Sequence, residues 1–441
     1  MATETRPVPV QELIEDRTLL IGDGYRARND ELSRKGLPFA RAQNIDGGFK
    51  FVGADCFPEG ALSRVGNKVS QPGDVVFTSK GTVGRFAFVR TETPRFVYSP
   101  QLCFWRSLNH ERIVPRWLFY WMQGRDFYEQ YKSVAGQTDM ADYVSLRDQR
   151  RMSISLPQVS EQRAIADILG TLDDKIELNR RTIEAVEAIA RALFKSWFID
   201  FDPVYAKASG ELTESICRRF GLTPDALALF PDRFRDSELG EIPEGWTIQS
   251  VYDLATYING AAYRTFEPNE ERHGLPIIKI AELKAGVTEQ TAYSDVQMQE
   301  KYQINRGDLL FSWSGNPDTS IDTFVWAHGP AWLNQHIFRV IPESSEERSF
   351  VFLTLKHLRP VFAEIARNKQ TTGLGHVTAE DMKRLKIVKP PEPTRNRWNE
   401  TVDPLLDQMF LRELESQTLD TLLDTLLPGL ISGQLRIPVA W

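Results

Sequence analysis

A repeated apolar seam constrains this chain more than any other feature, because only a long helix with a helical partner can bury it. From Ser160 to Phe198, apolar residues recur at alternating spacings of four and three, and about half of the positions between them are charged. Ser160 and Glu161 suit a helix start, and no proline follows before Phe198. About 39 helical residues would span roughly 60 Å. The pattern predicts one long coiled-coil helix.

The same seam returns near the C-terminus and supplies the partner. From Thr394 to Gly433 the alternation of four and three is repeated with a displacement of 233 residues, so that Asn179 corresponds to Arg412. The two segments predict an antiparallel helix pair. The polar pair Asn179 and Arg412 on a largely apolar seam predicts a position that fixes helix register.

Each long helix follows a globular segment, and the two globular segments share landmarks in the same order. The landmarks pair Gly36 with Gly274, Asp74 with Asp308, Gln101 with Gln335, and Pro157 with Pro390. This period far exceeds the roughly 20 to 50 residues of a solenoid repeat. The predicted fold is therefore α+β, with two globular domains joined by two long antiparallel coiled-coil helices in a pseudo-twofold internal repeat. The predicted bounds are 1–157 and 239–391 for the domains, 158–203 and 392–441 for the helices, and 204–238 for a linker.

Composition narrows the class of protein. Among 441 residues, 41% are hydrophobic and the formal net charge is −7, which argues against binding a polyanion through charge alone. Three cysteines without CxxC spacing indicate neither a disulfide framework nor a zinc site. There is no apolar run of the ~20 residues that a membrane span needs. We expect a cytoplasmic protein without a bound metal.

Catalytic motifs are missing from the sequence. It contains no GxxxxGK[ST], GxGxxG, HExxH or GxSxG, and no Asn/Asp-Pro-Pro-aromatic tetrapeptide of an amino-methylating enzyme. The paired carboxylates Asp173 and Asp174 fall on the flank of the first long helix, where we expect them to face solvent or a partner. We therefore predict no catalytic residue.

Polar loops suited to binding follow equivalent strands in both globular segments. Glycines there would let the backbone approach a ligand, while amide, hydroxyl and basic groups suit base edges and phosphates. An ordinary glycine hairpin, turn residues or internally satisfied amides would explain the same residues. In the first segment the candidates are Arg41, Gln43, Asn44, Ser79, Lys80, Thr82, Gln101, Gln137 and Thr138. In the second they are Lys279, Ser312, Trp313, Ser314, Asn316, Asn334, Gln335, His336, Thr371, Thr372 and His376.

Three stretches together resemble a known family. They are LPQVSEQRAIADILGTLDDKIELNRRTIEAVEAIARALFKSWFIDFDPV from Leu156 to Val204, LGEIPEGW from Leu239, and the strand entries PGDVVF and RGDLLF. The chain resembles the specificity subunit of type I restriction–modification systems along essentially its whole length. The resemblance implies two target recognition domains, each binding one half of an interrupted double-stranded DNA site, held apart by two conserved antiparallel helices.

The resemblance also implies partners. The helices would dock two methyltransferase (modification) subunits that carry S-adenosylmethionine, and restriction subunits could join to cleave DNA with ATP and Mg. This chain would then need no cofactor of its own. The matched positions make seven residues candidates for subunit contacts, namely Glu161, Gln162, Arg163, Lys195, Trp197, Phe198 and Asp200.

Two departures and two alternatives stay open at this point. The second helix has Thr394-Arg395-Asn396 in place of Glu161-Gln162-Arg163, and Pro404 and Pro428 can kink it. The first globular segment lacks the Gly-Glu-Ile-Pro-Glu-Gly-Trp opening, which leaves its N-terminal edge undefined. The alternatives are a recognition fragment of a fused methylating endonuclease and a helical adaptor between two proteins.

Overall fold

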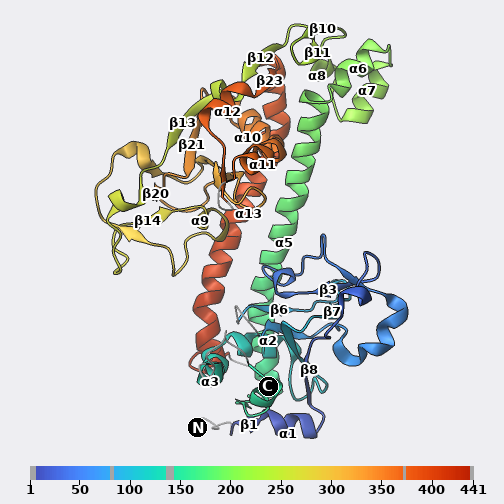
Figure 1. Ribbon diagram of the computed structural model, residues 1–441, viewed down its shortest axis with the longest axis vertical. Coiled ribbons are helices and arrows are strands. Elements are labelled where there is room, and N and C mark those ends of the chain that lie inside the picture. The colour runs from blue at the N-terminus through green and yellow to red at the C-terminus, as the bar shows by residue number, and fades with distance from the viewer. Residues whose placement is uncertain (1–5, 80–83, 136–143, 371–373, 438–441) are drawn as a thin grey trace. The chain divides into compact units, whose positions relative to one another are not determined.

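The protein forms two compact units in a computed structural model that describes residues 6–79, 84–135, 144–370 and 374–437 (Figure 1). Unit 1 combines Met1–Ile176 with Thr418–Trp441, and unit 2 is Glu177–Gln417. Both long helices, α5 (Val159–Phe198) and α13 (Glu392–Ile431), contribute residues to both units. The finer division into domains, spacer helices and a linker stays a prediction.

The two long helices are close to their predicted bounds and run antiparallel within each unit. In unit 2, Trp197 near the end of α5 packs on Trp398 near the start of α13, with ring centroids 5.4 Å apart. In unit 1, Ile165 near the start of α5 shares a core with Leu427 near the end of α13. The helix α13 continues through Pro404 and Pro428.

Unit 1 is built on two small sheets covered by helices. The larger sheet is antiparallel in the order β2-β8-β5-β6, and its central strands β8 and β5 are wholly buried. In the smaller sheet, β4-β3-β7, the strands β3 and β7 are parallel. The strands are β1 (Val8–Pro9), β2 (Leu19–Asp23), β3 (Leu37–Ala40), β4 (Cys56–Phe57), β5 (Val75–Thr78), β6 (Phe86–Phe88), β7 (Val97–Tyr98), β8 (Leu102–Ser107) and β9 (Ser153–Ile154). The shorter helices are α1 (Val10–Glu15), α2 (Pro115–Gln123), α3 (Arg125–Ala135) and α4 (Leu146–Gln149).

Unit 2 repeats these sheets in the same order. Its larger sheet is β13-β21-β17-β19, and its second sheet, β15-β14-β20-β16, again contains one parallel pair, β14 with β20. The strands are β10 (Phe234–Ser237), β11 (Gly240–Pro243), β12 (Thr247–Ser250), β13 (Ala255–Asn259), β14 (Leu275–Ile278), β15 (Tyr293–Ser294), β16 (Gln303–Ile304), β17 (Leu309–Ser312), β18 (Ser314–Gly315), β19 (Asp322–Val325), β20 (Ala331–Leu333), β21 (Ile337–Pro342), β22 (Gly375–His376) and β23 (Lys386–Lys389). The shorter helices are α6 (Asp202–Ala208), α7 (Thr213–Phe220), α8 (Pro224–Ala228), α9 (Glu282–Ala285), α10 (Arg348–His357), α11 (Arg359–Asn368) and α12 (Ala379–Arg384).

The predicted internal repeat is confirmed in atomic detail at the entry to the central strand. The Asp74 carboxylate accepts the Gln71 N–H at 2.8 Å, and the Asp308 carboxylate accepts the Asn305 N–H at 2.7 Å. In both units the aspartate also orients an arginine from the neighbouring strand, Arg106 or Arg339. An aspartate carboxylate at the equivalent position therefore closes the turn before β5 and the turn before β17.

Strand register corrects one of the predicted landmark pairs. Thr78 pairs with Leu102 in unit 1, and Ser312 pairs with Ile337 in unit 2. The residue before each partner strand is Gln101 in one unit and His336 in the other. The match of Gln101 with Gln335 is therefore wrong by one residue, because the turn of unit 2 is one residue further from β17.

The undefined N-terminal edge of unit 1 has a simple structural answer. The strand β1 pairs antiparallel with β9, as β12 pairs with β23 in unit 2. Val10 N then donates to Met152 O at 2.8 Å, and Val251 N donates to Leu385 O at 2.9 Å. Among the described residues, β1 is thus the equivalent of β12, and the hairpin of β10 and β11 is seen in unit 2.

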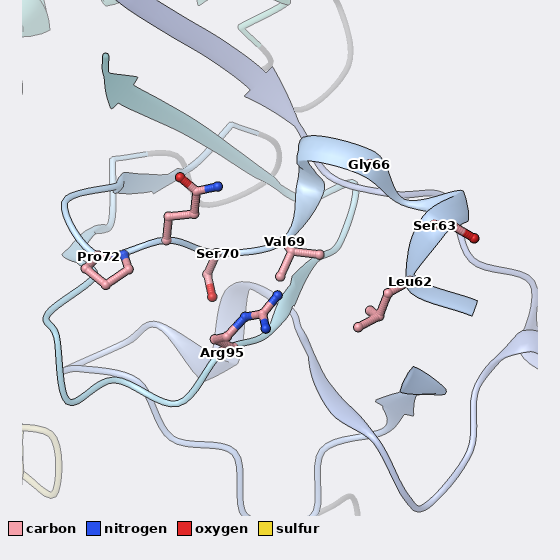
Figure 2. Close-up of a pocket in the computed structure, with 8 residues that line it drawn as sticks. Leu62, Ser63, Gly66, Val69, Ser70, Pro72 and Arg95 are labelled. Carbon is pink, nitrogen blue, oxygen red and sulfur yellow. The ribbon is translucent and has the colours of Figure 1, made fainter. Parts of the chain in front are cut away.

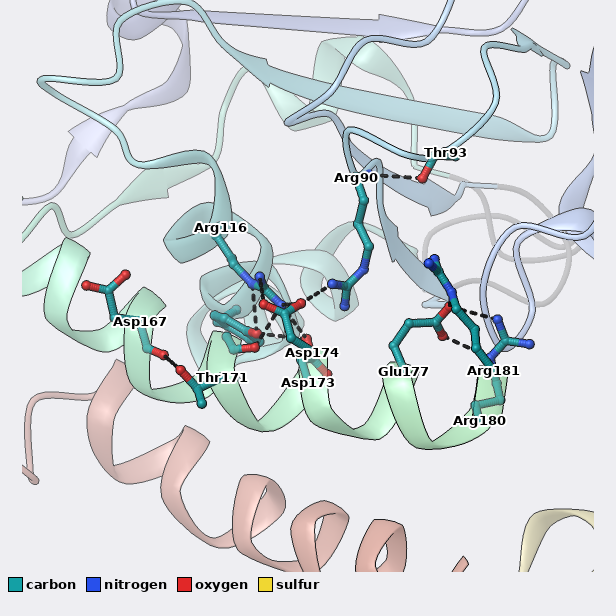
Figure 3. A network of polar contacts seen from close by, with 12 residues as sticks. Arg90, Thr93, Arg116, Asp167, Thr171, Asp173, Asp174, Glu177, Arg180 and Arg181 are labelled. Carbon is teal, nitrogen blue, oxygen red and sulfur yellow. Dashed lines mark hydrogen bonds and ion pairs between the residues drawn. The ribbon is translucent and has the colours of Figure 1, made fainter. Parts of the chain in front are cut away.

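The paired carboxylates of α5 bind other side chains of the chain. The prediction that they face solvent or a partner is therefore wrong for Asp173, which is partly buried, whereas Asp174 is exposed as predicted. Arg116 on α2 donates to both Asp174 oxygens at 2.8 Å, Arg90 also contacts Asp174, and Tyr120 Oη donates to Asp173 at 2.7 Å (Figure 3). Burial raises the pKa of Asp173, whereas at Asp174 the hydrogen bonds from the two arginines outweigh burial and lower the pKa. These contacts fix α5 against the body of unit 1.

The predicted polar position on the seam is present within unit 2. Asn179 is fully buried, and its Nδ2 donates to Glu415 Oε2 at 2.9 Å and to Ser416 Oγ at 3.3 Å. Its Oδ1 accepts from Arg412 at 3.4 Å, and Arg412 in turn lies 3.1 Å from Glu415. Asn179 and Arg412, the repeat-equivalent pair, therefore meet across the two helices.

Candidate nucleic-acid interface

Four segments that are far apart in sequence converge at one end of the unit 1 sheets. Ser79 N, just after β5, donates to Gln101 O in the turn before β8 at 3.1 Å. Ser79 O accepts from Val144 N at 3.1 Å, and Ser99 N donates to Ala40 O at the end of β3 at 2.9 Å. The backbone thus joins the ends of β3 and β5, the β7–β8 turn and the segment before α4.

Unit 2 builds the same frame from different side chains. Trp313 N donates to His336 O at 3.4 Å, and Trp313 O accepts from Val377 N at 2.8 Å. Asn334 N donates to Ile278 O at 3.1 Å. Three backbone hydrogen bonds therefore recur at equivalent places, although the residues that supply them differ in type.

A basic residue follows the parallel strand in both units. Arg41 comes directly after β3, and its N–H donates to Asn44 Oδ1 at 2.8 Å. Lys279 comes directly after β14, and its N–H donates to Glu282 Oε2 at 3.0 Å. The Arg41 and Lys279 side chains therefore extend from equivalent positions of the two backbone frames. Sequence reasoning named both residues at comparable places in the two segments, and the strands β3 and β14 show that they are equivalent.

Neighbouring groups hold both cations. The Arg41 guanidinium lies 2.8 Å from Asp55, and both side chains are partly exposed. Lys279 Nζ lies 5.1 Å from the centre of the Tyr263 ring, within cation–π range. Sequence reasoning missed Tyr263, and it sits in a Tyr-Arg dipeptide that recurs in unit 1 as Tyr25-Arg26.

The predicted DNA-binding residues of unit 1 fall into two groups. Gln43 and Gln101 are exposed, whereas Asn44 and Ser79 are buried. Asn44 also donates to Lys50 O at 2.8 Å, so both ends of its amide are used inside the chain. Asn44 and Ser79 can shape the interface but present little surface to a ligand.

In unit 2 an aromatic and amide cluster gathers predicted residues from separate segments. The Trp313 ring lies 5.6 Å from the His336 ring, and its Nε1 donates to Asn259 Oδ1 at 3.1 Å. Ser314 pairs with His376 between β18 and β22. Gln335 Nε2 lies 3.3 Å from His336 Nε2.

The other predicted residues of unit 2 lie near this cluster in sequence. Asn316 is exposed and its Oδ1 accepts the Asp318 and Thr319 N–H groups, while Ser312 and Asn334 are buried. Asn259 was missed, because nothing in its local sequence marks the end of β13 as adjacent to Trp313. Six predicted residues lie outside the described part of the chain, namely Lys80, Thr82, Gln137, Thr138, Thr371 and Thr372.

The seven candidates for subunit contacts divide by burial. Gln162, Trp197 and Phe198 are buried. Gln162 accepts from Val114 N at 2.9 Å and donates to Arg112 O and Pro157 O, each at 3.0 Å, so it anchors the start of α5 to its own domain. The accessible candidates are Glu161, Arg163, Lys195 and Asp200.

Two of the accessible candidates already have acidic neighbours. Arg163 lies 2.7 Å from Glu111, and Lys195 forms an ion pair with Asp200. Such exposed pairs contribute little to stability, typically ~0 to 1 kcal/mol. Their side chains can therefore exchange these contacts for a partner at small cost.

A separate pocket of about 520 Å³ opens on unit 1 (Figure 2). The Arg95 side chain reaches toward it, and none of the predicted binding residues lines it. Its lining comprises Leu62, Ser63, Gly66, Val69, Ser70, Gln71, Pro72 and Arg95. Within the described residues, no cluster of His, Cys, Asp and Glu could hold a metal ion, and no helix is long and apolar enough to cross a membrane.

Comparison with known families decides the class of the protein. The sequence profile of the type I restriction modification DNA specificity domain matches residues 31–188 and again residues 243–419. The chain belongs to this family. The specificity subunit thus carries two matched domains, in agreement with the internal repeat. Its role in a type I restriction–modification system is DNA recognition and not catalysis.

Relatives of this specificity subunit match most of its length. The HindI specificity subunit of Haemophilus influenzae is 25% identical over 413 residues, covering 83% of this chain and 88% of the relative. The MjaIX specificity subunit of Methanocaldococcus jannaschii is 23% identical, covering 86% and 81%. The crystal structure of a type I S subunit from M. genitalium shares the fold, with a TM-score of 0.52 and 13% identity over 98% of both chains.

Proposed function

We propose that each domain of this specificity subunit reads one half of an interrupted double-stranded DNA target. The observation that carries the proposal is the backbone frame built twice, with Gln101 presented on one copy and His336 on the other. A protein that recognises two different half-sites needs the same backbone frame twice, with a different polar side chain at the equivalent position of each copy. Base-edge contacts would supply the specificity.

The acidic charge of the chain limits how it can bind DNA. With a formal net charge of −7, long-range attraction to phosphates is weak, and specific contacts must carry more of the recognition. Arg41 and Lys279 supply one cation beside each frame. We therefore expect weak binding by the isolated chain and firm binding once partner subunits add phosphate contacts.

The partners in this proposal are two methyltransferase subunits docked on the long helices. Leu178 and Ile189 are 57% and 51% exposed on α5, and their repeat equivalents Leu411 and Leu422 are 63% and 43% exposed on α13. Large apolar side chains exposed together on a helix mark an interaction surface when they recur in a pattern. The same pair at a displacement of 233 residues fits one partner bound twice.

The rest of the assembly follows from this docking. S-adenosylmethionine would be held by the methyltransferase subunits, and ATP and Mg by restriction subunits if these join, so this chain would bind no cofactor. Such an assembly would work in the cytoplasm, where DNA is accessible. The chain itself would be confined to recognition and scaffolding.

The DNA-reading proposal is tested by assembling the chain with its methyltransferase partner and sequencing the methylation pattern on a randomised DNA library. We expect one motif with two specified halves and an unspecified spacer. A complex that methylates without sequence preference would contradict the proposal and favour a protein adaptor. Methyl transfer or DNA cleavage by the purified chain alone would favour a detached enzyme fragment.

Docking is tested separately by placing a charge on the exposed apolar pair. Leu178→Asp is expected to lower the stoichiometry from two partner subunits to one, and Leu178→Asp with Leu411→Asp to abolish assembly, as measured by sedimentation velocity. Leu212→Asp is the matched control, since Leu212 is 77% exposed and lies outside both long helices. Two bound partners on the double variant would contradict this docking surface.

A further inference from the structure

The turn before β8 in unit 1 and the turn before β21 in unit 2 each hold one side chain on a hydrogen-bonded backbone, Gln101 in the first turn and His336 in the second. In unit 1, Leu102 N donates to Ser99 O at 2.9 Å, and in unit 2, Ile337 N donates to Asn334 O at 3.2 Å. Together with the hydrogen bonds of the convergent frame, this closure holds the backbone of Gln101 at a defined place. The backbone hydrogen bonds of the turn recur in both units, whereas the residue at its tip differs, being Gln101 in unit 1 and His336 in unit 2.

The Gln101 amide has only one orientation compatible with its surroundings. Ala42 N lies 3.2 Å from Gln101 Oε1. A backbone N–H can only donate, so the carbonyl oxygen of the amide must face it. The amide nitrogen Nε2 therefore points away from Ala42, and among the described residues it has no hydrogen-bond partner. The exposed end of Gln101 is thus a preset donor.

The position of this donor suits a base edge. Ala42 follows Arg41, the cation at the end of β3, so the contact from Ala42 ties Gln101 to the segment that carries the Arg41 guanidinium. In the major groove, adenine and guanine offer N7, guanine also offers O6 and thymine offers O4 as acceptors, whereas the edge of cytosine offers the N4 donor. A donor on this turn favours the acceptor edges and repels cytosine.

We propose that Gln101 is a specificity-determining residue of the first half-site, with Nε2 donating to a base acceptor and so excluding cytosine at that position. This inference rests on the proposed function and adds one residue, one atom and one chemical preference to it. His336 holds the equivalent position in unit 2, where its Nε2 contacts Gln335, so a different group reads the second half-site.

The decisive variant is Gln101→Glu in the full complex with its methyltransferase partner. A glutamate oxygen still accepts from Ala42 N, but the donor is replaced by an acceptor. Methylation of a randomised DNA library should then shift toward cytosine at one position of one half-site, by about 10-fold or more relative to the wild-type base. Gln123→Glu is the matched control, because it adds the same charge at an exposed site on α2 where the amide donates to Phe119 O at 3.2 Å.

Each outcome decides something different. An unchanged motif with Gln101→Glu, or a change in the half-site read by unit 2, would overturn the inference while leaving the bipartite reading intact. A wild-type complex without any bipartite motif would instead overturn the proposed function. If Gln101→Glu does not assemble, Gln101→Met removes the donor without adding charge and should relax the preference at the same position; a fully retained preference would again overturn the inference.

Discussion

Asn179→Leu offers the sharpest test of how the two long helices keep their register. Asn179 is fully buried and bonds to Glu415 at 2.9 Å, to Ser416 at 3.3 Å and to Arg412 at 3.4 Å. These groups face Asn179 in only one alignment of α5 and α13. Leucine could pack opposite any apolar seam position, so the substitution removes the selection among alignments.

The energetic terms of this substitution nearly cancel. A hydrogen bond to a charged group contributes ~1.5 to 3 kcal/mol, and burying a leucine side chain contributes a similar ~1.5 to 3 kcal/mol. Arg412 and Glu415 keep their mutual contact at 3.1 Å, and side-chain exposures of 34% and 40% let water replace the lost amide. We therefore expect the free energy of unfolding to change by no more than about 1 kcal/mol.

Register is then measured independently of stability. Spin labels at Ala188 and Gln408, both exposed within unit 2, should give one narrow distance in the wild type and a second population in Asn179→Leu. A slip of one heptad moves a helix by ~10 Å. The volume-conserving control Ile183→Leu should keep one distance. A single unshifted distance in Asn179→Leu, with unchanged half-site spacing, would show that Asn179 is only tolerated.

Three further perturbations have defined outcomes. Arg116→Met removes the 2.8 Å contacts to Asp174 and should lower the free energy of unfolding of unit 1 by about 1 kcal/mol in urea denaturation, since Arg90 still holds the carboxylate; an unchanged midpoint would contradict this. Hydrogen bonds from Arg180 lower the pKa of Glu177 from 4.5 to about 2, so its stabilising contribution is complete above pH 4.5 and is lost as the pH falls toward 2. Glu177→Gln should therefore cost about 1 kcal/mol at pH 7 and progressively less as the pH falls through 2, and a difference that does not depend on pH would refute the assignment. Deleting one heptad from both long helices together should change the half-site spacing by about three base pairs, and an unaltered spacing would remove their role as a ruler.

Periodicity made the long helices and the repeat predictable from sequence. The seam places apolar residues at spacings that only a helix can align, so the predicted Ser160–Phe198 differs from the observed Val159–Phe198 by one residue. The entry turns at Asp74 and Asp308 were equally readable, because aspartate before an apolar strand is a local signal. The long helices and the strand-entry turns could therefore be predicted, because each depends on the spacing of residues that are close together in the sequence.

Features set by tertiary contacts could not be predicted. Gln101 and Gln335 share a residue type, but strand register makes His336 the equivalent of Gln101, since the segment between β17 and this turn is one residue longer than the segment between β5 and its turn. The contact of Asp174 with Arg116 joins residues 58 positions apart on two helices whose packing no local pattern reveals. Likewise, the orientation of the Gln101 amide depends on Ala42 N, which only the fold brings near.

We propose that each domain of this specificity subunit reads its own half of the DNA target. Exchanging residues 1–157 for the corresponding segment of another specificity subunit, assembling the hybrid with the methyltransferase partner and sequencing the methylated sites tests it most directly. We expect one half of the motif to change while the other half stays the same. A change in both halves, or in neither, would contradict it.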